Sequence, residues 1–184
     1  KNTRIPLTYA YAVRNYIWLD KSLSAAQKLD LLNDALNRFN DYKFSESYQG
    51  YADFQRGRLL ASKALILRGT GRVSESVGFL NQAVFFLKEA VKLVERKDGL
   101  ECKLVLAWAL LLQDEWLLKQ KEYNSITVLS NLNYATELCK EVLEQDPKNK
   151  YAKFHKLHAE VLSFKVKEPR TNNSSQLKEA ARSK

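Results

Sequence analysis

The sequence is poor in the residues that make turns and crosslinks: its 184 residues include three prolines, six glycines and two cysteines. A domain of many short strands needs more turn-forming residues than this, so the composition favours helices. Cys102 and Cys139 are too few for a disulfide framework, and each lies in an apolar helical pattern, where a thiol behaves as a small hydrophobe. We therefore expect an intracellular protein, cytoplasmic or nuclear, from a reducing compartment.

The motifs of common enzymes are also missing. The sequence has no phosphate-binding loop, no dinucleotide-binding glycine pattern and no nucleophile elbow. His155 and His158 lie one helical turn apart, but no Cys or carboxylate lies at the spacing of a zinc site. Asp114 and Glu115 sit in a strongly apolar helix, where either a raised pKa or pairing with a Lys or Arg of a neighbouring helix is open, and we expect the pairing. The sequence predicts no catalytic site, no metal and no cofactor.

Long apolar runs and signal sequences are absent as well. The longest apolar stretch, residues 104–112, is cut short by three polar residues, whereas a membrane span needs roughly 18 apolar residues. This stretch therefore predicts a central buried helix. The N-terminus has neither the apolar run of a signal peptide nor an initiator methionine, so we expect a piece of a longer protein.

The charge is strongly positive but dispersed. A net charge of +9 attracts nucleic acid, anionic membranes or acidic proteins. The 30 basic and 21 acidic residues are mixed along the chain, and no block of five or six basic residues occurs. The charge thus raises the expectation of nucleic-acid binding only modestly.

Hydrophobic periodicity predicts about seven helices. Ser24 and Gln27 form a capping-box pattern at the start of the second helix, and Gly69-Thr70-Gly71 ends the third. We interpret residues 119–130 as a connection or an extra helical turn. The helices are expected at about 7–19, 24–40, 47–68, 74–96, 100–120, 131–145 and 150–164.

Two regions carry a repeat pattern. Ala135, Cys139 and Val142 precede Pro147 at offsets of twelve, eight and five. A second region places small or apolar residues at matching positions: Ala64, Gly71, Ser76, Leu80 and Ala83. Both regions resemble the tetratricopeptide repeat, in which paired helices approach closely only where no bulky side chain intervenes.

The resemblance implies an all-α fold: a right-handed stack of antiparallel helix pairs, or TPR-like α-solenoid. We expect it to occupy residues 1–165, and residues 166–184 to form a polar tail with a short helix at most. The helix pairs begin near residues 7, 50, 102 and 150, which is wider than the family's spacing of about 34 residues. A TPR-like or more general α-solenoid is therefore a better description than a strict repeat array.

The resemblance also implies a binding groove lined by the first helix of each pair. In the second pair its register places Arg58, Ala61, Leu65 and Arg68 in this groove, where a positive rim suits an acidic or carboxylate-bearing peptide. The alternative is that Arg58 and Arg68 are ordinary solvated charges. Ala61 and Leu65 occupy positions where chaperone-tail binders of the family carry Lys and Asn, so we do not expect that specificity.

The prediction includes two further features, an exposed aromatic residue and a histidine beside the core. Phe85 projects with Lys88 and Lys92 toward the solvent side of its helix, which indicates either a partner contact or burial against a neighbouring segment. His158 is expected to flank the core beside Phe154, Leu157 and Val161.

The sequence therefore predicts a non-enzymatic scaffold that binds a peptide or partner protein within a larger complex. The alternative is an RNA-binding module that uses its basic side chains for backbone contacts. Those side chains are Arg58, Arg68, Arg72, Lys150, Lys153 and Lys156. For the lysines, a solvated helix face is a third interpretation.

Overall fold

The computed structural model describes residues 4–94, 96–120 and 123–167, and within them the chain forms seven helices and no strand. The predicted all-α class is therefore confirmed. The helices are α1 (Arg4–Leu19), α2 (Ala25–Asn40), α3 (Glu46–Gly69), α4 (Val73–Leu93), α5 (Arg96–Leu118), α6 (Ser125–Gln145) and α7 (Lys150–Lys167). The end of α7 lies two residues beyond the predicted domain boundary, and the predicted tail from residue 168 onward lies outside the described residues.

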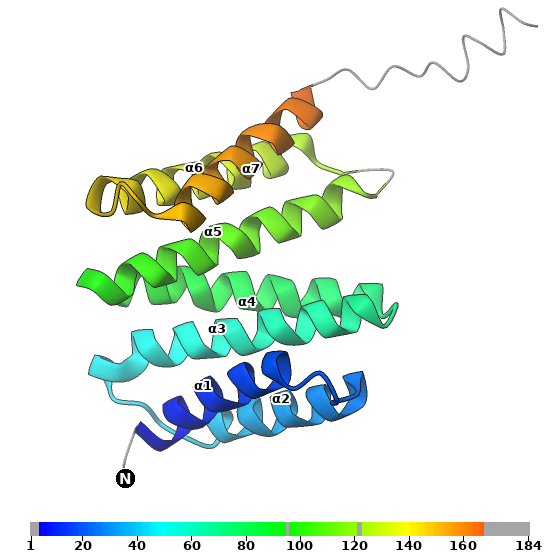
Figure 1. Cartoon of the computed structure of the whole chain (residues 1–184), viewed down its shortest axis with the longest axis vertical. Coiled ribbons are helices and arrows are strands. Elements are labelled where there is room, and N and C mark those ends of the chain that lie inside the picture. Colours follow the sequence, from blue (N-terminus) through cyan, green and yellow to red (C-terminus); the bar gives the residue numbers. More distant parts are fainter. Residues whose placement is uncertain (1–3, 95, 121–122, 168–184) are drawn as a thin grey trace, which may run out of the picture.

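The helices pack as a stack of antiparallel pairs (Figure 1). α1 pairs with α2, α3 with α4 and α5 with α6, while α7 packs on α5 and α6. Elements that are distant in the sequence do not pack together: α1 reaches no further than α3, and α7 no further than α5. Such nearest-neighbour packing is the defining property of an α-solenoid.

Local signals explain where the helices begin and end. The Ser24 side chain accepts a hydrogen bond from the Gln27 backbone, and the Gln27 side chain accepts one from the Ser24 backbone, so the predicted capping box is present. Gly71 adopts a φ of 83° after α3, a conformation that few residues other than glycine tolerate. These two features fix the turns inside the first and second helix pairs, between α1 and α2 and between α3 and α4.

The start of α6 differs from the prediction. We expected residues 119–130 to be a connection or a single turn, but α6 begins at Ser125. The Asn124 side chain accepts hydrogen bonds from the backbone N–H groups of Ile126 and Thr127, at 3.0 and 3.1 Å. Val128 is fully buried. The cap and this burial outweigh the modest helix penalty of β-branched residues.

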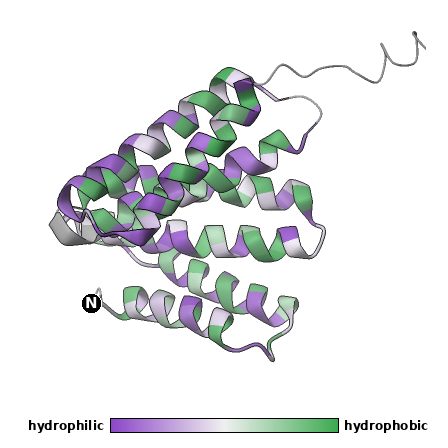
Figure 2. Ribbon diagram, turned by 45° about the horizontal axis from the view of Figure 1, so that its top comes forward, coloured by the Kyte–Doolittle hydropathy of each residue, from purple (hydrophilic) through white to green (hydrophobic). Residues whose placement is uncertain are grey.

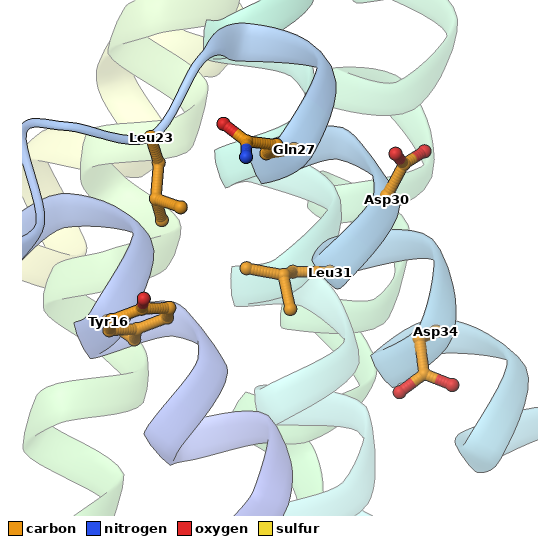
Figure 3. Close-up of a pocket in the computed structure, with 6 residues that line it drawn as sticks. All are labelled: Tyr16, Leu23, Gln27, Asp30, Leu31 and Asp34. Atoms are coloured by element: carbon orange, nitrogen blue, oxygen red, sulfur yellow. The ribbon is translucent and has the colours of Figure 1, made fainter.

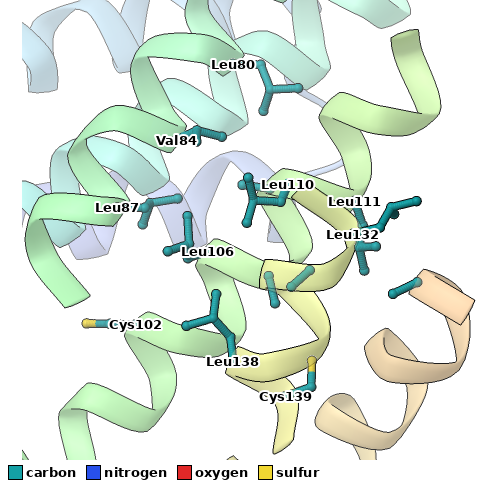
Figure 4. Packing of buried hydrophobic residues seen from close by; sticks show 14 of the residues in the cluster. Leu80, Val84, Leu87, Cys102, Leu106, Leu110, Leu111, Leu132, Leu138 and Cys139 are labelled. Carbon is teal, nitrogen blue, oxygen red and sulfur yellow. The ribbon is translucent and has the colours of Figure 1, made fainter. Parts of the chain in front are cut away.

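The core consists of a main hydrophobic cluster and a smaller N-terminal one. The main cluster runs from α3 to α7 and includes the fully buried Leu106 and Leu110 of α5, so the predicted central helix is confirmed (Figure 4). The smaller cluster joins α1, α2 and α3. Ala135, Cys139 and Val142 are each fully buried, as the repeat pattern predicts.

Most helices keep a polar side. Hydrophilic and hydrophobic residues alternate along them (Figure 2), as expected where one side faces the core. No helix in the described part of the chain is long and apolar enough to cross a membrane.

Candidate partner-binding groove

The odd-numbered helices form one layer of the stack and the even-numbered helices the other (Figure 1). The backbones of α1 and α3 approach each other, as do those of α3 and α5 and of α5 and α7. Within the described residues, α2 and α4 make no such approach, and neither do α4 and α6. A stack curves toward its more closely spaced layer, so α1, α3 and α5 line its inner face.

A cavity of about 270 Å³ opens in this layer between α1, α3 and α5. Each of these helices contributes side chains, and those of α5 are apolar. The lining residues are Arg14, Trp18, Arg58, Ser62, Leu65, Val105 and Trp108. We call this set the groove. It combines an apolar wall with two cationic groups, which is the composition of a site for a peptide that carries a carboxylate.

One of the two groove arginines is paired with a carboxylate. Arg58 donates from Nη1 to Oε1 of Glu101 at 2.7 Å, and its guanidinium lies 4.9 Å from the centroid of the Phe54 ring. Nε of Arg14 is buried and has no hydrogen-bond partner, although Nη2 donates to Oδ1 of Asn15 at 3.1 Å. The groove therefore holds two cations and one unused buried donor, and Glu101 beside it pairs with Arg58.

Burial lowers the pKa of both arginines. Loss of solvent lowers the pKa of Arg14, and the positive charge of Arg58 lowers it further. Burial is also the largest cause that lowers the pKa of Arg58, opposed by Glu101. Both side chains remain charged, because an arginine pKa lies far above neutrality. An incoming carboxylate would relieve the repulsion between them.

Two tryptophans line the groove, Trp18 from α1 and Trp108 from α5. Trp18 is about half exposed, and its indole N–H donates to Oγ of Ser62 at 3.4 Å. Trp108 is half-buried against the main core. A partly exposed indole supplies a large apolar surface at little entropic cost, as in many protein interfaces.

Two of the four predicted groove residues line the cavity, and two do not. Arg58 and Leu65 lie in it. Ala61 is fully buried between α3 and α4, so that prediction was wrong for contact with a partner. Arg68 places its guanidinium 4.9 Å from the centroid of the Trp116 ring, outside the cavity.

Phe85 lies on α4, in the even-numbered layer, and is 60% exposed. Its predicted exposure is confirmed, although its edge packs against Phe86. Lys92 is paired with Glu89 at 2.6 Å, and Lys88 lies over the Tyr134 ring at 5.9 Å. This surface is separate from the groove, and its role in binding stays a prediction.

The predicted RNA contacts do not gather in one place. Arg72 makes two short hydrogen bonds to Glu75, so its charge is neutralised. Lys150 and Lys153 are exposed on α7, and Lys156 lies 4.0 Å from Glu160. Arg58 and Arg68 lie on α3, which makes no contact with α7 and its lysines.

The two adjacent acidic residues of α5, Asp114 and Glu115, have other partners than expected. Asp114 accepts a hydrogen bond from Asn131, and Glu115 contacts Nε2 of His158 at 3.0 Å. The predicted pairing with Lys or Arg was therefore wrong for both. Within the described residues no three metal-ligating side chains come together.

A wider cavity of about 450 Å³ opens between α1 and α2 (Figure 3). Its wall contains two carboxylates, but that of Asp34 already accepts hydrogen bonds from Tyr9 and Arg38. The other lining residues are Tyr16, Leu23, Gln27, Asp30 and Leu31. This cavity lacks the cations and the tryptophans of the groove.

No protein-family model and no curated protein matches the chain. Among solved structures, it is similar to that of the yeast histone chaperone Hif1, described as a scaffold protein recruiting protein complexes to core histones. The TM-score is 0.59 at 17% sequence identity. The match covers 84% of this chain and 59% of the other. A similarity at this level of identity shows a shared fold.

The repeat register in the sequence identified two of the seven groove residues. It was applied only to the second helix pair and therefore found Arg58 and Leu65. The first helices of the other pairs, α1 and α5, contribute Arg14, Trp18 and Trp108 to the groove. Tryptophans on the first helix of a pair were the available signal.

Proposed function

We propose that this chain is a non-enzymatic, TPR-like scaffold whose groove binds an extended, carboxylate-bearing segment of a partner protein inside the cell. The observation that carries the proposal is the pair Arg14 and Arg58 beside one apolar cavity, where Glu101 pairs with Arg58. An acidic side chain or a chain terminus would pair with the surplus charge, while Trp18 and Leu65 would hold an adjacent apolar residue.

The fold supports the scaffold part of this proposal. Helical solenoids offer extended inner surfaces for partner proteins. The similar yeast protein is itself described as a scaffold that recruits complexes. The acidic character of the segment rests on the groove alone.

A peptide-binding experiment tests the proposal. Fluorescein-labelled decapeptides that contain Leu or Trp beside Asp or Glu would be compared with matched neutral peptides, in which Asn or Gln replaces each acidic residue. Fluorescence anisotropy should show about tenfold tighter binding of the acidic members, and Arg14→Gln or Arg58→Gln should remove this preference. Arg72→Gln is the matched control, because Arg72 lies outside the groove and is paired with Glu75. Equal binding of the acidic and the matched neutral peptides would overturn the proposal. Unchanged binding by folded Arg14→Gln and Arg58→Gln proteins would overturn it as well.

RNA binding is the second candidate, supported by the net charge of +9. The dispersed and partly paired basic side chains favour it less than the groove favours a peptide. Single-stranded RNA that is retained at about 50 mM salt and released by about 200 mM would support it. No retention at the lower salt concentration would exclude it.

A further inference from the structure

Helix α7 is apolar on two opposite sides. One side carries Ala152, Ala159 and Leu162, which are buried in the main core. The other side carries Phe154, Leu157, Val161 and Phe164, which are exposed by 62, 60, 45 and 71%. Our expectation that three of these four residues would border the core beside His158 was therefore wrong. A helix with apolar residues all round is normally covered on all sides.

The four exposed residues form one continuous stripe. Their spacings of three, four and three residues place them on a single helical face about 15 Å long. α7 packs only on α5 and α6 among the described elements. We call these four residues the α7 stripe. Its size and spacing match the footprint of one amphipathic helix lying along α7.

A notch at one end of the stripe offers an anchor point. A cavity of about 250 Å³ lies between α6 and α7, and Phe164 belongs both to its wall and to the stripe. The other lining residues are Asn133, Thr136, Glu160, Ser163 and Lys167. A cavity of this size beside an exposed aromatic side chain accommodates one large apolar side chain of a bound helix.

The charge beside the stripe is strongly positive. α7 contains five lysines and one acidic residue, Glu160, which lies near Lys156. On the helical projection Lys153 and Lys165 border the stripe on its two sides. A bound helix therefore needs carboxylates beside its apolar face.

Two candidate occupants do not fit this charge. Residues 168–184 contain four basic and two acidic residues, with Leu177 as the only large apolar one. A second copy docked through the same stripe would bring two lysine-rich helices together. Neither supplies the required combination of several apolar residues and flanking carboxylates.

We propose that the α7 stripe is a second interaction surface, which binds an acidic amphipathic helix of a partner protein. The apolar residues of that helix cover Phe154, Leu157, Val161 and Phe164, and one of them enters the notch between α6 and α7. Its carboxylates lie against Lys153 and Lys165. This surface lies on α7, the last of the described helices, apart from the groove, so the scaffold engages two partner segments at once.

The test uses three designed 20-residue peptides as probes. The first is helical, with Leu recurring at positions i, i+3, i+4 and i+7 to form an apolar face, and with Glu on both sides of that face. The second keeps the leucines and replaces every Glu by Lys, and the third has the composition of the first but two central prolines. The full chain should bind the first peptide at least tenfold tighter than the other two, measured by fluorescence anisotropy.

Variants then locate the binding surface. Leu157→Gln and Phe164→Gln should each weaken binding of the acidic helix at least tenfold, whereas Phe85→Gln, which alters an equally exposed aromatic on α4, should not. Lys153→Glu together with Lys165→Glu should shift the preference toward the lysine peptide. Circular dichroism verifies that each variant stays folded.

Several outcomes would overturn the inference. These are equal binding of acidic and basic helices, binding unaffected by folded Leu157→Gln and Phe164→Gln proteins, or dimerisation of the wild type that Phe164→Gln abolishes in sedimentation experiments. Arg14→Gln and Arg58→Gln should leave helix binding intact. The proposal for the groove and the proposal for the α7 stripe can therefore be refuted independently of each other.

Discussion

The side-chain amide of Asn131 in α6 donates a 2.9 Å hydrogen bond to Oδ1 of Asp114 in α5, and Oδ2 of the same carboxyl is buried without a partner. Asp114 is fully buried. Burial raises the pKa of Asp114 from 3.8 to about 7, and the Asn131 hydrogen bond opposes this only in part. A carboxyl in this setting holds its proton up to neutral pH.

Asp114 should therefore make the protein less stable as the pH rises. The unfolded carboxyl loses its proton near pH 3.8, whereas the folded one keeps it to about pH 7. Between these values the folded state binds more protons, so the free energy of unfolding falls with rising pH and levels off above about pH 7. In Asp114→Asn this decline should be smaller, with a gain of about 1 to 3 kcal/mol at pH 8. Urea unfolding at pH 5, 6, 7 and 8 measures how the free energy of unfolding changes with pH in the wild type and in Asp114→Asn.

Asp30→Asn is the control for this experiment, because Asp30 is exposed on α2. Its pH dependence should parallel that of the wild type. Parallel curves for Asp114→Asn and wild type would mean that Asp114 is not the carboxyl responsible.

Gly57 lies at a close contact between α3 and α4. A Cβ atom at this position would lie 2.7 Å from Cγ of Leu87 and 3.2 Å from the carbonyl oxygen of Ala83. Gly57→Ala should therefore destabilise the protein by about 1 to 3 kcal/mol, despite the better helix propensity of alanine. Thermal unfolding followed by circular dichroism measures the change.

Gly78 provides the matched control in the next helix. It lies inside α4, and a Cβ atom there would meet no atom within 4 Å. Gly78→Ala should stabilise the protein by about 0.5 to 1 kcal/mol. A stabilising Gly57→Ala of similar size would show that the two helices are less closely packed than described.

The capping box of α2 should contribute measurably to the N-terminal pair. Ser24→Ala removes the acceptor for the Gln27 backbone N–H and should cost about 1 kcal/mol. Ser24→Asp keeps an acceptor and should retain most of the stability. Chemical denaturation of both variants gives the comparison, and equal losses would indicate that the hydrogen bond contributes little.

The sequence predicts this fold well where the chain carries local signals. The Ser24 cap, the turn at Gly71 and the small residues near Pro147 locate helix ends and helix pairs correctly. The start of α6 was missed, because residues 119–124 are largely polar and Asn124 was not recognised as a cap. All of these signals, including the Asn124 cap, lie within one or two turns of the helix end that they define.

The candidate sites depend on which face of a helix is buried, and periodicity alone does not decide this. α7 has two apolar faces, and the larger side chains suggested that Phe154 and Leu157 bordered the core. The structure buries the face with Ala152 and Ala159, because small side chains allow α7 to approach α5 and α6 closely. The contact between Glu115 and His158 spans 43 residues and has no local signal.

Both cysteines should be inert in the folded protein. Cys102 and Cys139 are buried thiols, and burial raises the pKa of Cys139 from 9.0 to about 11. The thiolate is the reactive form, so this shift alone lowers the reactive fraction of Cys139 about a hundredfold at pH 8. Ellman's reagent should therefore show no fast reaction in buffer and two reactive thiols in 6 M guanidinium. Ser74→Cys, which places a thiol on the exposed start of α4, should add one fast-reacting group. A fast-reacting thiol in the wild type would mean that the core around α5 and α6 opens far more readily than its packing indicates.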